Sequence, residues 1–427
     1  MGLLTVRLMS CADFGELSRV VHGFKLFVCR SRFDLPHCDP ERKLIGSPST
    51  LRKPCPVGGL LNGLTLLIFC LSIFSACIKL GPVVGGRISS LQDDLDRKSL
   101  RRAIAQSLRY LEKIPADRLV GEWPKRVTAG EVRESLLAFV GLLERLDDPE
   151  KLQEEIHARF QLYPSAGISE KADVLFTGYY QPVIDGSLKK TALYRFPIYR
   201  KPDDLWETTS GDMARYYSRH DIDRSGRLSG KGYEIAWVRD PVDLFFLHLQ
   251  GSGLLRLEDG RLLRLNYAVS NGRPYTSIGQ VLVERGKLRV EDLSMQRLRR
   301  YLKEHPEERD ELLARNERYI FFRFVKESAL GSLGVPLTAG RSIATDSRLF
   351  PKGALAFIIT QRPILDVSGE IAGWRPFSRF VLNQDTGSAI RGTNRVDLYF
   401  GTGPQAGAAA GHMKSRGRLY FLVIKRP

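Results

Sequence analysis

Cysteine is missing from most of this chain. All six cysteines fall in the first part of the 427-residue sequence, and none follows Cys77. The remainder therefore cannot contain a disulfide framework, a cysteine nucleophile or a thiolate metal site. Among the early residues, Cys29, His37, Cys38 and Cys55 have spacings that match no zinc finger or ribbon. Histidine is also scarce, with seven residues, so we expect neither a metal ion nor a cofactor.

Acidic residues are outnumbered, with 65 Lys and Arg residues against 48 Asp and Glu residues and a net charge of +17. A positive excess of this size favours a polyanionic partner, such as nucleic acid, anionic lipid or the carboxylate-bearing cell wall. The basic residues are dispersed rather than clustered, which is equally typical of a well-solvated surface. The sequence contains no nucleic-acid-binding motif, dinucleotide fingerprint or CxxC pair. We therefore expect no nucleic-acid partner and no redox role.

A long apolar run lies near the N-terminus. No charge occurs between Lys53 and Lys79, and residues 60–76 are almost wholly apolar. A basic stretch, an apolar run and small residues before Cys77 resemble a bacterial lipoprotein signal, in which the cysteine is lipidated. Phe74 departs from this pattern, where an aliphatic residue is usual. An uncleaved membrane anchor is the alternative, because the run is nearly long enough to span a bilayer. Both interpretations tether the following residues to a membrane, outside the cytoplasm.

This signal divides the N-terminal part of the chain. We interpret residues 1–50 as a spurious or disordered extension, because they are polar and basic and lack a sustained period. Residues 51–77 would be the signal peptide and residues 78–90 a flexible tether. Lipidation of Cys77 would place the mature chain at the periplasmic face of the outer membrane, since Ile78 is not the aspartate that favours inner-membrane retention.

Hydrophobic periodicity predicts helices over residues 95–111, 132–146 and 151–160, and a further helical region over 290–315 that is interrupted at Pro306. Elsewhere, short apolar segments alternate with Gly- and Asp-rich turns, which is typical of strands. The predicted strands are 174–180, 193–199, 233–238, 244–250, 262–267, 319–325, 342–345, 354–360, 379–384, 396–400 and 419–424. The final strands lack an intervening helix long enough for a parallel crossover, so we expect closed or nearly closed β-barrels.

Three aspartates in the C-terminal part are candidate acids. Asp385 follows a strand and precedes Gly387, and such a glycine-loosened turn exposes a carboxylate and lets a ligand approach the backbone. Acid–base cleavage of a sugar chain needs a carboxylate in that position. Alternation along the next strand places Asp397 and Tyr399 on the same face. Asp346 precedes a turn, where capping of backbone N–H groups is the simpler role.

Several short motifs are spread over residues 174–425. They are Phe176–Pro182 (FTGYYQP), Phe196–Tyr199 (FPIY), Phe245–Gly253 (FFLHLQGSG), Asn271–Gly279 (NGRPYTSIG), Asn316–Phe322 and the three-aspartate region with Asp385–Gly392 (DTGSAIRG). In this order they resemble the membrane-bound lytic transglycosylases of the MltA type, which cut bacterial peptidoglycan. The resemblance implies a mainly β fold with N-terminal helices. A double-psi β-barrel of residues 91–182 and 318–427 would be interrupted by an inserted β-rich domain of residues 183–317, with a groove between them.

The same resemblance implies a set of site residues. The family's catalytic aspartate corresponds to Asp385, and its other two aspartates correspond to Asp397 and Asp346 in supporting roles. The implied substrate-binding residues are Thr177, Tyr179, Tyr180, Gln250, Ser252, Tyr275, Thr276, Ser277 and Gly387. Packing between domains and turn hydrogen bonds are the alternative roles for these polar groups.

A lytic transglycosylase breaks the β-1,4 bond between N-acetylmuramic acid and N-acetylglucosamine without adding water. One carboxyl group acts first as acid and then as base, and the muramyl 6-hydroxyl closes a 1,6-anhydro ring. A glycoside hydrolase that uses Asp385 and Asp397 is an alternative, as is a non-catalytic wall-binding lipoprotein. We expect peptidoglycan glycan strands and a lipid anchor as partners, while protein partners are not predicted.

Overall fold

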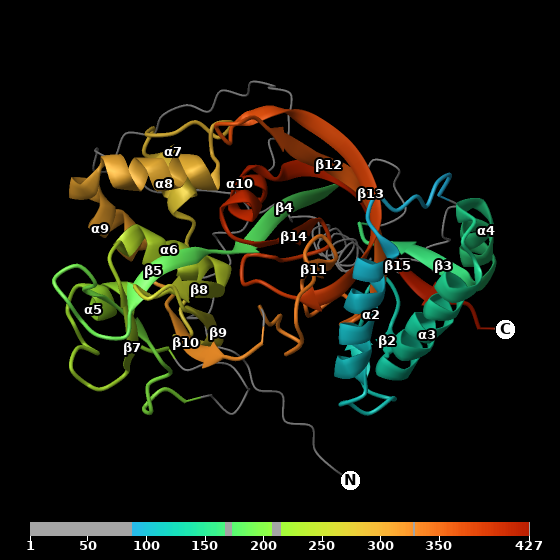
Figure 1. The fold of residues 1–427 in the computed structure, drawn as a ribbon, viewed down its shortest axis with the longest axis horizontal. Helices are drawn as coiled ribbons and strands as arrows, with labels where there is room; N and C mark the ends of the chain where they lie inside the picture. Colours follow the sequence, from blue (N-terminus) through green and yellow to red (C-terminus); the bar gives the residue numbers. More distant parts are fainter. Residues whose placement is uncertain (1–87, 167–172, 207–214, 328, 427) are drawn as a thin grey trace, which may run out of the picture. The chain divides into compact units, whose positions relative to one another are not determined.

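The computed structural model describes residues 88–166, 173–206, 215–327 and 329–426 (Figure 1). The predicted extension, the signal peptide with Cys77 and most of the tether lie outside these residues. Among the residues that are described, no helix combines the length and the apolar character needed to cross a bilayer.

The three predicted N-terminal helices are confirmed as α2 (Arg97–Leu111), α3 (Ala129–Arg145) and α4 (Pro149–Arg159). Their first residues follow side-chain caps. The Asp96 carboxylate accepts a hydrogen bond from the Ser99 amide at the start of α2, and Thr128 forms a capping box with Glu131 at the start of α3. The apolar faces of α2 and α3 join one core with the strands of the first sheet, where Phe139 is fully buried against Phe380.

The first sheet has seven strands in the order β12-β13-β11-β14-β4-β15-β3. An additional pairing between β12 and β15 closes six of these strands into a barrel, and β3 extends it at one side. The bounds are β3 (Phe160–Pro164), β4 (Val174–Gln181), β11 (Ser342–Ala344), β12 (Leu355–Leu365), β13 (Ile371–Asp385), β14 (Arg395–Thr402) and β15 (Lys414–Ile424). The expectation of a closed barrel is thus confirmed. A separate short pair, β1 (Leu119–Gly121) and β2 (Val127–Thr128), precedes α3.

The second sheet has six strands in the order β10-β9-β8-β5-β7-β6. Its strands are β5 (Val183–Ser187), β6 (Phe196–Tyr199), β7 (Glu234–Val238), β8 (Ser252–Arg256), β9 (Leu262–Ser270) and β10 (Ile320–Val325). Because β10 pairs along its whole length with β9, it belongs to this sheet and not to the barrel. The predicted boundary at residue 318 therefore places one strand in the wrong unit.

Helices interleave with the second sheet, so this part of the chain is mixed α/β rather than β-rich. They are α5 (Arg219–Asp223), α6 (Pro241–Gln250), α7 (Ile278–Glu284), α8 (Met295–Glu304) and α9 (Pro306–Arg315), and α10 (Pro404–His412) follows β14. The break predicted at Pro306 separates α8 from α9. The strand predicted over residues 244–250 is wrong, because these residues lie in α6. Asp240 caps that helix and Gly251 ends it in the left-handed conformation, with a φ of 72°.

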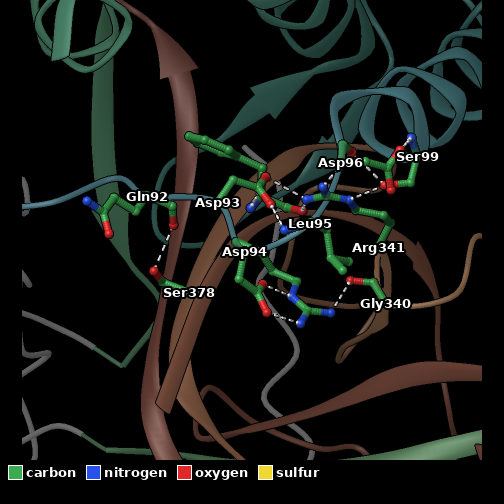
Figure 2. A network of polar contacts seen from close by, with 11 residues as sticks. Gln92, Asp93, Asp94, Leu95, Asp96, Ser99, Gly340, Arg341 and Ser378 are labelled. Atoms are coloured by element: carbon green, nitrogen blue, oxygen red, sulfur yellow. Dashed lines mark hydrogen bonds and ion pairs between the residues drawn. The ribbon is translucent and has the colours of Figure 1, made fainter. Parts of the chain in front are cut away.

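A network of hydrogen bonds and ion pairs connects the segment that precedes α2 to the strands of the barrel (Figure 2). Arg341, which is fully buried, donates hydrogen bonds to the Asp93 carboxylate (2.6 Å) and to the carbonyl groups of Phe380 and Asp96. Arg379 forms a two-bond ion pair with Asp94, at 2.7 and 2.8 Å. Arg341 directly precedes β11 and Arg379 lies in β13, so the network holds the two strands that position the candidate site.

Candidate active site

Strand pairing brings two of the candidate aspartates into one row across the barrel. Ala344 of β11 pairs with Asp385 of β13 on one side and with Asp397 of β14 on the other. Asp397 in turn pairs with Thr177 of β4. Neighbouring strands lie ~4.8 Å apart, so the backbones of the two aspartates are roughly 10 Å apart, and paired residues present their side chains to the same face.

The Asp385 carboxylate is half-buried and accepts three hydrogen bonds. Its Oδ1 atom accepts from the backbone amides of Ser332 and Thr386, both at 2.9 Å. Its Oδ2 atom accepts from the Tyr179 hydroxyl at 3.0 Å. Burial raises the pKa of Asp385 to about 6, although the hydrogen bonds from Thr386, Ser332 and Tyr179 favour the charged form and offset part of this effect. Burial, rather than a neighbouring carboxylate, is thus the main cause of the raised pKa.

The two oxygens of Asp385 differ in the partners they face. The amides at Oδ1 can only donate, so this oxygen remains an acceptor. The Tyr179 hydroxyl at Oδ2 can donate or accept, so a proton on the carboxyl group belongs on Oδ2. The site can therefore hold an acid with one defined reactive oxygen near neutral pH.

The residues before Asp385 are tied to the barrel and to α2, which fixes the end of β13. Gln384 is fully buried and donates to the Ala103 carbonyl of α2 (2.7 Å), and its oxygen accepts from the Ser342 hydroxyl (2.6 Å). The buried Asn383 side chain donates to the Pro351 carbonyl and accepts from the Thr345 hydroxyl. A carboxyl group held on so fixed a backbone keeps its orientation when a ligand approaches.

Tyr179 and Tyr399 lie side by side next to Asp385. The two residues are paired between β4 and β14, and their ring centroids are 5.2 Å apart. Burial and the nearby Asp385 charge raise the pKa of Tyr179 well above its ordinary value, so its hydroxyl stays neutral. Tyr399 was not among the predicted binding residues, although the strand alternation already placed it on the face of Asp397.

Asp397 is held by two neighbours on the same face. Its Oδ1 atom accepts a hydrogen bond from the Thr177 hydroxyl and lies 3.5 Å from the Arg395 Nε atom. Tyr275 lies close enough for the charges of Arg395 and Asp397 to act on it, although burial is the main cause of its raised pKa. Residues from β4, β14 and the segment before α7 are therefore brought together here.

Asp346 has a different environment from the other two aspartates. Its side chain is fully buried, and it accepts hydrogen bonds from the Arg348 guanidinium (2.7 and 3.0 Å) and from the Gly392 amide (2.9 Å). The Arg348 side chain holds the pKa of Asp346 well below its usual range. These contacts fit the turn-capping alternative, in which a permanently ionised Asp346 fixes the loop between β13 and β14 at Gly392.

The other predicted binding residues divide into buried and accessible groups. Tyr180 and Ser252 are buried, and the Gln250 side chain accepts a hydrogen bond from the Tyr180 amide at 3.0 Å. Thr276 and Ser277 are half-buried near the start of α7, where the Ser277 hydroxyl accepts from the Gln280 amide at 3.3 Å. For Tyr180 these contacts agree with the packing alternative; a substrate role for the others remains a prediction.

Sequence reasoning missed the contact that Ser332 makes with Asp385. The segment around Ser332, between β10 and β11, has neither a periodic pattern nor a motif. It can approach the end of β13 only because Gly331 has no side chain, since a Cβ atom there would lie 2.4 Å from the Gln384 carbonyl oxygen. A glycine in such a position was the one available signal.

Comparison with known proteins gives matches in both the barrel and the insert. Residues 175–323 match the family model described as the MltA specific insert domain, and residues 341–423 match the 3D domain. Membrane-bound lytic murein transglycosylase A of Escherichia coli (strain K12) is 36% identical over 259 residues, which cover 60% of this chain and 67% of that protein.

Two solved structures are also similar. The membrane-bound lytic murein transglycosylase from Agrobacterium tumefaciens has a TM-score of 0.66 and 32% identity, and the match covers 78% of this chain and 94% of that one. E. coli MltA with bound chitohexaose has a TM-score of 0.61 and 28% identity, with 81% and 100% of the two chains covered. The matches extend over both sheets, and the model for the insert ends within β10.

Proposed function

The chain belongs to the MltA family of lytic murein transglycosylases, and from this membership we propose that it cleaves the β-1,4 bond between N-acetylmuramic acid and N-acetylglucosamine in peptidoglycan, with Asp385 as its single acid and base. The observation that carries the proposal is the Asp385 carboxyl group, whose pKa is raised to about 6 by burial and whose Oδ2 atom is the oxygen left for a proton. An acid with a pKa near neutrality can both give and take back a proton in one turnover.

In this proposal, each step uses the contacts of Asp385. Asp385 protonates the glycosidic oxygen through Oδ2, and the bond from that oxygen to C1 of the muramyl residue breaks. The muramyl 6-hydroxyl then attacks C1 and its proton passes to the same Oδ2 atom. The carboxyl group is thereby regenerated and the ring closes as a 1,6-anhydro product without the addition of water. The amides of Ser332 and Thr386 stabilise the carboxylate while it is charged.

The chemistry of the new chain ends tests this proposal. A transglycosylase leaves anhydro ends that borohydride cannot label, whereas hydrolysis by two carboxyl groups leaves reducing ends that it labels. Asp397 is already held by Thr177 and Arg395, which leaves it poorly placed to activate a water molecule. We therefore expect unlabelled ends, and labelling of every new end would favour the hydrolase.

The remaining assignments are part of the same proposal. The barrel would be a double-psi β-barrel, supported by the parallel pairs β11–β13 and β14–β4, and the inserted domain would extend from residue 183 to the end of β10. Glycan would lie over the row of Asp385 and Asp397. Its contacts would come from Thr177, Tyr179, Gln250, Ser252, Tyr275, Thr276, Ser277 and the backbone at Gly387. The family is membrane-bound, and lipidation of Cys77 would anchor this chain in the cell envelope.

Activity is expected to depend on pH through Asp385 and its partner Tyr179. Because the acid must be protonated, kcat/KM of the wild-type enzyme should fall as the pH rises through about 6. Tyr179→Phe removes a hydrogen bond that favours the charged carboxylate, so the pKa of Asp385 should rise and the fall should move upward by about one pH unit. The measurement is kcat/KM against pH on purified peptidoglycan.

Tyr399→Phe is the matched control for Tyr179→Phe, because the Tyr399 hydroxyl contacts Thr402 and forms no hydrogen bond with Asp385. In Tyr399→Phe, kcat/KM should decrease over the same pH range as in the wild type. If kcat/KM of Tyr179→Phe also decreases over that range, the Tyr179 hydroxyl does not set the protonation of Asp385.

Asp397→Asn should lower activity and move the pH profile in the opposite direction. The change weakens the contacts with Thr177 and Arg395, for which we expect a loss of about tenfold in kcat/KM. It also removes a negative charge near Asp385, which should lower the pKa of Asp385 slightly. The decrease in kcat/KM should therefore occur at a slightly lower pH than in the wild type. An unchanged profile with unchanged activity would remove Asp397 from the site.

A further inference from the structure

A cavity of about 400 Å³ lies in the inserted domain, among residues that the proposed reaction does not use. Its walls come from β6, α5, β7 and the ends of α6 and α9, at the edge of the second sheet where β6 pairs with β7. A volume of this size suits a small ligand or the end of a short peptide.

One wall of the cavity is apolar and partly aromatic. Pro197 and Trp237 are cross-strand partners in β6 and β7, so their side chains share a face, and Phe196 and Tyr199 line the same cavity. Trp237 is half-buried and lines the cavity, whereas the Phe196 side chain packs against the core cluster that contains Ile198 and Val238. An aromatic wall of this kind packs against the aliphatic part of a ligand.

A carboxyl group with a weak partner lies at α5. The Asp223 side chain is 33% exposed, and its Oδ2 atom is 3.5 Å from Arg219 Nη1. Arg219 is almost fully buried and gives its shorter hydrogen bonds to the carbonyl groups of Asn316 and Arg318 and to His248. Asp223 is an exposed residue and lines the cavity, so its carboxyl group is open to a ligand.

Two cations line the same cavity. Lys190 and Arg195 form no ion pair with any of the described residues, and the Arg195 guanidinium lies 5.2 Å from the centre of the Phe196 ring. Arg224, by contrast, is paired with Asp310 at 2.6 Å. The groups left for a ligand are therefore the carboxyl groups of Asp223 and Glu234, of which Glu234 accepts a hydrogen bond from the Gly230 amide, together with two cations and an aromatic wall.

From this arrangement we propose that the cavity binds the zwitterionic end of a peptide, in which an ammonium group meets Asp223 and a carboxylate meets Lys190 and Arg195. Peptidoglycan carries peptide stems with free amino and carboxyl groups, so this inference rests on the proposed function and extends it. The insert would hold a stem peptide while the barrel cuts the glycan. A neutral sugar would use the aromatic wall but leave the opposite charges unmatched.

Isothermal titration calorimetry of the full chain with a synthetic stem tetrapeptide tests the proposal. The tetrapeptide carries a diamino acid whose side chain ends in an ammonium and a carboxylate. Acetylation of that ammonium, or amidation of that carboxylate, should each weaken binding at least about tenfold, since each removes a charge-assisted hydrogen bond. Because this ligand contains no glycan, the result does not depend on whether Asp385 cuts sugar chains.

Three variants test whether the peptide binds in the cavity or elsewhere on the surface. Asp223→Asn should bind the tetrapeptide about tenfold more weakly than the wild type does, but should bind the acetylated peptide equally well. Arg195→Gln should also bind the tetrapeptide about tenfold more weakly, but should bind the amidated peptide as the wild type does. Asp259→Asn, which changes an exposed carboxylate of the insert outside the cavity, should bind like the wild type. The proposal is overturned if the tetrapeptide does not bind, or if both cavity variants bind it unchanged. It is also overturned if chitohexaose competes fully for the same site.

Discussion

Replacement of Asp385 with asparagine is expected to lower the release of anhydro-muropeptides by at least about a hundredfold, because general acid–base catalysis contributes factors of that order and above. The amide has nearly the shape of the carboxyl group and can still accept the hydrogen bonds of Ser332 and Thr386. It cannot donate a proton to the glycosidic oxygen. Binding to purified peptidoglycan, measured by co-sedimentation, should therefore persist while release of soluble fragments stops.

The raised pKa of Asp385 predicts how this variant affects stability, which separates a loss of catalysis from a loss of folding. Its folded value of about 6 exceeds the unfolded value of about 3.9, so folding disfavours the charged form. The stability that the protonated group contributes is complete below pH about 4 and is lost as the pH rises through about 6. At pH 7 the asparagine variant should melt no lower than the wild type. A variant that melts normally and retains the wild-type rate would refute the assignment of Asp385.

Removal of the Arg341 side chain is expected to have the largest effect on stability. Arg341→Leu deletes a fully buried guanidinium and leaves the Asp93 carboxylate and the carbonyl groups of Phe380 and Asp96 without their partner. Breaking a buried ion pair from one side costs about 3–5 kcal/mol in the free energy of unfolding. Urea unfolding of the two proteins at pH 7 measures this difference.

Arg261→Leu is the matched control, because Arg261 forms an ion pair with Asp259 in which both side chains are more than half exposed. Exposed pairs of this kind contribute about 0–1 kcal/mol. If Arg341→Leu costs no more than Arg261→Leu, the polar network does not fasten the segment before α2 to β11 and β13. The network would then also not be what holds β11 and β13 in position around Asp385.

The sequence was sufficient to predict secondary structure and candidate site residues where the local pattern and the long-range structure agree. The three N-terminal helices, the break at Pro306 and the strands of the barrel follow their periodicity, and the motifs around Asp385 pointed to an acid at the end of a strand. The alternation in β14 correctly placed Asp397 and Tyr399 on one face. In each case the signal lies within a few consecutive residues.

The sequence was insufficient where the outcome depends on partners far along the chain. Residues 244–250 form a buried apolar run that suits a strand as well as a helix, and only the cap at Asp240 and the packing of α6 decide between them. β10 joins the second sheet through its pairing with β9, which no local pattern specifies. The Ser332 amide reaches Asp385 across 53 residues of sequence, and the Arg348 side chain determines that Asp346 is held ionised in a turn.

Mass spectrometry of the soluble fragments released from purified peptidoglycan tests most directly whether Asp385 alone carries the reaction. The wild-type enzyme should release muropeptides that are lighter by one water than the hydrolysis products, and Asp385→Asn should release none above the background without enzyme. Fragments with the mass of hydrolysis products, or anhydro fragments released at the wild-type rate by Asp385→Asn, would contradict a single-acid transglycosylase centred on Asp385.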